Sequence, residues 1–169
     1  MPEAFIHTNA DELIEALRVK EKDMAAALKG EGEQVARDMQ ADYRRTTASW
    51  SHQVTFEKLV DTQADGSFSA LVGTDDRIYG YVDQGTHGPY PIPKVAGGKM
   101  LKFKGGYRAK TTPGRIGSHG GGAFGAFKFR RQVMHPGIKP RRFTKMIFDK
   151  HKQLSLRRIA RRLAEVWGK

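Results

Sequence analysis

The chain has 169 residues, no cysteine and a formal net charge of +12. A domain of this length buries enough surface to fold without cross-links, and the lack of cysteine excludes disulfides and thiolate metal sites. No apolar run approaches the roughly 20 residues that a membrane-spanning helix needs, and the N-terminus lacks the pattern of a signal peptide, so we expect no membrane partner.

The charge is divided unevenly along the chain. Residues 1–98 contain 10 Lys/Arg and 16 Asp/Glu, a net charge of −6. Residues 99–169 contain 20 Lys/Arg and two acids, Asp149 and Glu165, a net charge of +18. Such a basic half predicts a polyanion, or the acidic half of a second copy, as its partner. The alternative is that these residues only solvate a surface.

The first predicted element is a long amphipathic helix over residues 10–45. Apolar positions recur there at intervals of eleven residues, almost three whole turns, and therefore share one face. They are Leu13, Leu17, Met24, Leu28, Val35 and Met39. This face predicts packing on the domain's own sheet, with a coiled coil between subunits as the alternative. Gly30 and Gly32 predict a bend or break inside the helix.

Residues 53–104 and 129–134 predict a small, mainly antiparallel sheet of about four strands. Its first half is a hairpin, because apolar residues alternate on either side of a turn at 61–66. A short helical turn over 77–84, ended by Gly85, follows the hairpin.

Residues 105–128 contain eight glycines and little alternation. A segment of this composition cannot offset its ordering entropy with a core of its own. We therefore expect a flexible surface loop over 105–128.

A C-terminal helix is predicted over residues 142–167 by apolar residues at helical spacing. Arg157 and Arg161 form one ridge on it, and Arg158 and Arg162 form a second. The whole chain is thus predicted to be a single α+β domain, in which the N-terminal and C-terminal helices pack on the small sheet.

No catalytic, metal or cofactor site is predicted. Residues 120–125 match G-x-G-x-x-G, but the strand and helix that dinucleotide binding requires are not predicted around them. The six histidines do not pair at metal-ligand spacing, and Asp75, Asp76 and Asp83 are the only candidates for paired acid–base carboxylates. We therefore expect no enzymatic activity.

Two sequence islands carry a resemblance to a known family. The first runs from Ile78 to Thr86, reading IYGYVDQGT, and the second from His135 to Phe143, reading HPGIKPRRF, with the strand Met100–Phe103 between them. Together they resemble the head–tail joining proteins of long-tailed bacteriophages, also called minor tail, neck or tail-completion proteins. The residues that carry the resemblance are Tyr79, Tyr81, Val82, Asp83, Gly85, Thr86, His135, Pro136, Gly137, Pro140 and Phe143.

The resemblance implies a structural virion protein of the neck or tail, assembled in the host cytoplasm. Its copies would form a six-fold ring between the head-connector and the tail-terminator or tail-tube proteins, with double-stranded DNA passing through the lumen. The divided charge agrees with such a ring, because a head-to-tail interface sets acidic against basic halves.

The alternative function is sequence-independent nucleic-acid binding through the basic half, because Lys and Arg neutralise phosphates and release counterions. Candidate contacts to a neighbouring subunit or to DNA are Lys102, Lys104, Arg130, Arg131, Arg157, Arg158, Arg161 and Arg162.

Overall fold

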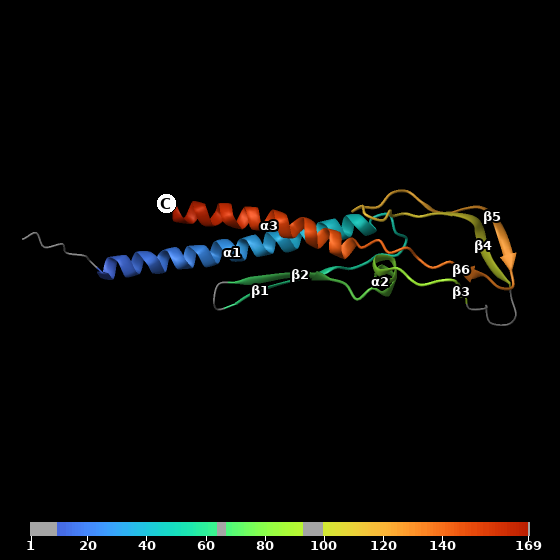
Figure 1. Cartoon of the computed structure of the whole chain (residues 1–169), viewed down its shortest axis with the longest axis horizontal. Coiled ribbons are helices and arrows are strands. Elements are labelled where there is room, and N and C mark those ends of the chain that lie inside the picture. Colours follow the sequence, from blue (N-terminus) through green and yellow to red (C-terminus); the bar gives the residue numbers. More distant parts are fainter. Residues whose placement is uncertain (1–9, 64–66, 93–99, 169) are drawn as a thin grey trace, which may run out of the picture.

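A computed structural model describes residues 10–63, 67–92 and 100–168 of the chain. Two long helices dominate it: α1 (Ala10–Thr47) and α3 (Phe143–Trp167). They lie side by side and run antiparallel, and the N-terminal part of α1 extends beyond the C-terminal end of α3 (Figure 1). A short helix, α2 (Arg77–Gln84), lies near the end where α1 finishes and α3 begins.

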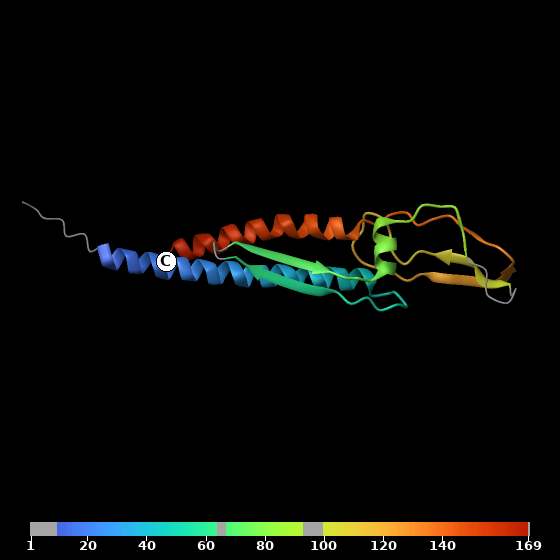
Figure 2. The same cartoon turned by 90° about the horizontal axis from the view of Figure 1, so that it is seen from below.

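The α+β class predicted from the sequence is confirmed, and the strands form three small antiparallel sheets. These are β1 (Glu57–Thr62) with β2 (Phe68–Gly73), β3 (Tyr90–Pro91) with β6 (Met134–His135), and β4 (Leu101–Arg108) with β5 (Gly122–Arg130). The molecule is elongated. The helices and β1–β2 form one end, and the other two sheets form the opposite end (Figures 1 and 2).

The core lies where α1, β1–β2, α2 and α3 meet. Aromatic rings form its centre: Tyr43 stacks on Phe56 with ring centroids 5.0 Å apart, and Phe56 meets the edge of Tyr79 at 5.3 Å. The buried apolar residues are Val35, Ala36, Met39, Tyr43, Phe56, Val72, Tyr79, Phe143 and Ile147. The hydrophobic core therefore involves only the second half of α1 and the first half of α3.

The apolar stripe of α1 is used unevenly. Val35 and Met39 are buried as predicted, whereas Leu13 and Leu17 are exposed. The helix also continues through Gly30 and Gly32, so the break expected there is wrong. Gly32 has a packing role instead: a Cβ at this position would lie 2.6 Å from the Phe68 ring, and its absence lets β2 approach α1 closely.

The flexible loop expected over 105–128 is wrong in its bounds. Residues 105–108 belong to β4 and 122–128 to β5, so the connecting loop covers only 109–121. This loop is tied to the end of α1, where helix carbonyls lack partners within the helix. Ser118 Oγ donates to the Arg45 carbonyl at 3.2 Å, and Lys110 Nζ donates to the Ser49 carbonyl at 2.8 Å. Antiparallel pairing, these bonds and the packing of Ile116 against the core order the glycine-rich segment.

Candidate functional site: the motif junction and two charged surfaces

The two sequence motifs meet in a single backbone junction. Thr86 and Ile138, 52 positions apart, form an antiparallel bridge. The Thr86 amide donates to the Ile138 carbonyl at 3.0 Å, and the Ile138 amide donates to the Thr86 carbonyl at 3.1 Å. The Thr86 hydroxyl accepts a further bond from the Ile138 amide at 3.0 Å. The two islands are thus two sides of one structural unit.

Glycine permits the close approach of the two motifs. Gly85 has a φ of 80°, and a Cβ on it would lie 2.6 Å from the Ile138 carbonyl oxygen. Gly137 has a φ of 89°, and a Cβ there would lie 2.5 Å from the Thr86 carbonyl oxygen. Any other residue at either position would be strained and would push the motifs apart.

Asp83 joins the first motif to the start of α3. Its carboxylate accepts from the Thr144 amide at 3.1 Å, and its main-chain carbonyl accepts from the amides of Arg141 and Arg142. The carboxylate satisfies one of the free amides at a helix N-terminus 61 positions away.

The aromatic residues of the motifs have separate places. Tyr79 is buried, lies with its ring centroid 6.4 Å from that of Phe143, and shares a hydrogen bond with the Thr144 hydroxyl at 3.2 Å. Burial raises the pKa of Tyr79. Tyr81 is exposed on the other side of α2. The first motif therefore supplies both a core residue and a surface residue.

The second motif begins at His135, whose ring makes two contacts. Its imidazole stacks on Tyr90 with centroids 5.0 Å apart, and Nδ1 accepts from the Gly137 amide at 3.0 Å. Pro140 follows and contacts the position that a Cβ on Gly85 would occupy. These contacts fix the turn.

Two of the three carboxylates considered for acid–base chemistry, Asp76 and Asp83, bond the first amides of helices. Asp76 accepts from the Tyr79 amide at 2.7 Å at the start of α2 and is paired with His52. Burial opposes ionisation of Asp76, but the His52 ring and the Tyr79 amide hold its pKa below the usual value. Asp83 caps α3 as described above.

Among the described residues, no group of three or more His, Asp or Glu side chains is placed to hold a metal ion. In the same part of the chain, no helix combines the length and apolarity needed to cross a membrane.

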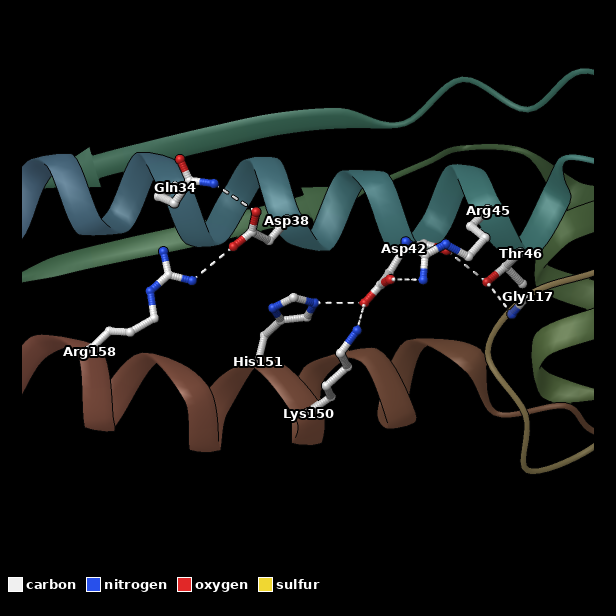
Figure 3. A network of polar contacts seen from close by, with 9 residues as sticks. All are labelled: Gln34, Asp38, Asp42, Arg45, Thr46, Gly117, Lys150, His151 and Arg158. Atoms are coloured by element: carbon white, nitrogen blue, oxygen red, sulfur yellow. Dashed lines mark hydrogen bonds and ion pairs between the residues drawn. The ribbon is translucent and has the colours of Figure 1, made fainter.

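The first charged surface is the interface between α1 and α3, where basic residues of α3 face acidic residues of α1 (Figure 3). Asp42, almost fully buried, accepts from Lys150 Nζ at 2.5 Å and pairs with His151 Nε2 at 2.9 Å. Burial raises the pKa of Asp42, but the bonds from Lys150 and His151 outweigh it and hold the pKa below its usual value. Part of the charge division in the sequence is thus compensated within one chain.

Arg158 belongs to the same interface between α1 and α3. Its Nε lies 2.5 Å from Glu31, its guanidinium donates to Asp38 at 2.9 Å, and only 27% of its side chain is exposed. These contacts hold the pKa of Asp38 below its usual value against the opposing effect of burial. Arg158 therefore makes its ion pairs within one chain, and its role as a contact to a neighbour or to DNA stays a prediction.

The remaining candidate arginines of α3 stay accessible. Arg161 and Arg162 approach Glu165 at 3.9 and 3.1 Å on the helix surface, where such pairs contribute little. Arg157 is exposed and makes no ion pair with any described residue. These three residues remain available for a partner.

The second charged surface is the β4–β5 arm, meaning the two strands β4 and β5. Lys102 and Lys104 lie opposite Phe129 and Phe127 in the register and share a face with them. The Lys102 ammonium sits 4.3 Å from the centroid of the Phe127 ring, within the range of a cation–π contact. Arg130 pairs with Leu101 and therefore belongs to the opposite face, and Arg131 follows the strand.

The phenylalanines of the arm were missed by the sequence interpretation, which assigned most of them to a loop. Phe124, Phe127 and Phe129 are 57%, 54% and 52% exposed. Phe127 and Phe129 alternate as in a strand, and Gly125 interrupts this alternation between Phe124 and Phe127; together they are the signal that indicates a strand with a bulge.

Comparison of the chain with known protein families, with curated proteins and with solved structures finds no match.

Proposed function

We propose that this protein is a structural subunit of a bacteriophage neck, a tail-completion or head–tail joining protein whose copies form a six-fold ring around the passing DNA. The two motifs that carry the resemblance support this class. Their residues are used for backbone bridging, helix capping and packing, as a structural role requires. The role involves no catalytic step.

The observation that carries self-assembly is the surface that one copy leaves exposed. The chain exposes 12918 Å² for a mass of 18.9 kDa, whereas a compact monomer of that mass exposes about 8300 Å². Large apolar side chains are part of this surface. They include Leu13 and Leu17 on α1, Leu59 and Leu71 on β1–β2, and the phenylalanines of the arm. Exposed apolar groups of this extent mark protein interaction sites.

The mass of the purified protein in solution tests the proposal. Sedimentation velocity of the protein alone, and with isolated phage heads and tails, should yield a species of six times 18.9 kDa or its incorporation into joined particles. A protein that stays monomeric in every mixture, and does not affect joining, would contradict the proposal.

A second candidate function, sequence-independent nucleic-acid binding, is favoured by the arm. Exposed rings beside lysines provide stacking for bases and charge for phosphates. Fluorescence anisotropy with single-stranded and duplex DNA over a series of salt concentrations measures this directly. Tight binding by a monomer, without any assembly, would favour this function over the ring.

A further inference from the structure

The outer surface of the β4–β5 arm is a continuous row of aromatic rings beside cations. A register shift makes it continuous: Lys104 pairs with Phe127 and Gly106 with Phe124, so β5 contains one extra residue at this point. Gly125, with a φ of 81°, accommodates the bulge. Phe124 consequently joins Phe127 and Phe129 on one face, although the spacing of the three in the sequence is uneven. We call Lys102, Lys104, Phe124, Phe127 and Phe129 the arm face.

The arm face is built for contact. The Phe124 ring covers Gly106, where a Cβ would lie 2.5 Å from the ring, and so extends the row across both strands. No Asp or Glu occurs in residues 99–148, so no acid on the arm offsets its lysines. An isolated pair of strands is marginally stable in water, and β4 and β5 pack on each other rather than on the helices. A covering partner with negative charge and apolar side chains is the match for this face.

The chain contains such a surface on the β1–β2 sheet. In the β1–β2 register, Leu59 pairs with Leu71 on the side opposite the core, and the two side chains are 62% and 64% exposed. Glu57 and Asp61 lie two positions either side of Leu59 and therefore share its face. Neither acid pairs with a cation in the part of the chain that the structure describes. We call Glu57, Leu59, Asp61 and Leu71 the hairpin face.

The arm face and the hairpin face lie at different ends of the elongated molecule and cannot meet within one copy (Figures 1 and 2). Contact between them therefore joins two copies. Because the two faces differ, the contact is heterologous, and repeating it closes a ring when the rotation allows.

We propose that the arm face of one copy docks on the hairpin face of the next, with Phe127 and its neighbours on Leu59 and Leu71 and with Lys102 and Lys104 against Glu57 and Asp61. This inference rests on the proposed self-assembly and names its interface. The exposed N-terminal half of α1 is a poorer match for the arm, because Arg18, Lys20 and Lys22 stand among its acids.

Engineered cysteines test the contact, since the chain has none of its own. Ser69→Cys places a thiol on the hairpin face, opposite Asp61, and Lys104→Cys places one on the arm face. Both keep the apolar side chains in place. Mixing the two variants with a short bismaleimide should give a cross-linked species of twice 18.9 kDa, and neither variant alone should give it.

Two further single-cysteine variants serve as controls. Leu156→Cys replaces an exposed residue of α3 that belongs to neither face, and Leu17→Cys replaces an exposed residue on the N-terminal half of α1. Neither should cross-link to Lys104→Cys. A Lys104→Cys cross-link to Leu17→Cys in place of Ser69→Cys would overturn the assignment of the hairpin face.

Charge reversal provides an independent measurement. Glu57→Lys with Asp61→Lys, or Lys102→Glu with Lys104→Glu, should each weaken assembly at least about tenfold, the factor that 1.4 kcal/mol produces. Mixing the two double variants should restore assembly between them, and circular dichroism of each should match that of the wild type.

The outcomes separate this inference from the proposed function. If an oligomer forms but the Ser69→Cys and Lys104→Cys variants do not cross-link, and charge reversal does not change assembly, the proposed interface is wrong. The proposed ring is not contradicted by that result. A wild-type protein that never assembles overturns both. Normal assembly combined with loss of single-stranded DNA binding in Lys102→Glu/Lys104→Glu would reassign the arm face to nucleic acid.

Discussion

Individual residues in this protein act mainly as connections between distant segments. Asp83, Gly85 and Gly137 have their partners across the motif junction, and Asp42 connects α1 to two residues of α3. The contribution of each residue to stability therefore depends on the partner that the fold places against it, and single-residue variants can measure that contribution.

Replacing Gly85 with Ala should destabilise the protein by about 1–3 kcal/mol or more, because a residue with a Cβ is strained at its φ of 80° and ψ of 174°. The clash with the Ile138 carbonyl adds to that cost. Gly80→Ala is the matched control: it lies inside α2 with no atom within 4 Å of the new Cβ, so it should stabilise by about 0.5–1 kcal/mol. Urea unfolding of both variants gives the free energies, and equal effects would contradict the role of the junction.

Asp42 should make the free energy of unfolding depend on pH in the acidic range. Its pKa in the folded protein is below the ordinary value of 3.8, so its contribution is present above that value and is lost as the pH falls through the folded pKa. Asp42→Asn should cost about 2 kcal/mol at pH 7, the scale of a hydrogen bond to a charged group. The difference from wild type should shrink toward zero when unfolding is measured near pH 2.

Asp149→Asn is the control for this measurement, because Asp149 pairs with Lys145 on the exposed surface of α3. Such a pair contributes about 0.5 kcal/mol or less. A pH dependence that is the same in Asp42→Asn and wild type would show that the buried carboxylate does not govern acid stability.

Among the elements, α1 and α3 are held by two different kinds of contact. Near the junction they share an apolar core with β1–β2, and further along they are joined by ion pairs between acids of α1 and bases of α3. The outermost turns of α1 have apolar side chains with no cover in the described chain. Along its length, the helix pair is therefore held first by the apolar core and then by ion pairs, and its outermost turns are exposed.

Arg158→Gln should destabilise the helix pair by about 1–3 kcal/mol, because it leaves Glu31 and Asp38 without their shared cation. Arg157→Gln, one residue away and exposed, should stay within about 0.5 kcal/mol of wild type. Thermal unfolding of the two variants measures the difference. The Asp38 pKa, followed by NMR, should also rise in Arg158→Gln alone, and an unchanged pKa would contradict the ion pair.

At the scale of the whole molecule, the elongated shape separates surfaces that compact folds would cover. The arm face is basic and aromatic, and the hairpin face is acidic and aliphatic. The two faces lie on separate parts of the molecule (Figure 1). In the proposed ring, each of these surfaces would meet its complement in another copy.

The proposed assembly should weaken as salt is raised, because its charged groups are screened at a Debye length of about 10 Å in 0.1 M salt and about 3 Å in 1 M. Sedimentation velocity at both concentrations should show the average mass falling. An interface that is only apolar would be unchanged or strengthened by a salting-out anion such as sulfate. A constant mass across the series would contradict charge complementarity between copies.

Periodicity in the sequence was sufficient to predict α1, α2, α3 and the β1–β2 hairpin, because helical and strand spacing and the glycine at position 85 act locally. The two motifs were identified separately, by the resemblance that their residues carry. The fate of the basic residues was decided by tertiary structure: Arg158 and Arg161 look alike in the sequence, yet only Arg158 faces Glu31 and Asp38.

The strands of the arm could likewise not be predicted from the local sequence, because their glycines favour a loop. Only the pairing of β4 with β5 supplies the hydrogen bonds that make this segment a sheet. Local propensity determines which segments are helices, whereas the partner of a charge or an edge strand depends on which distant segment the fold brings against it.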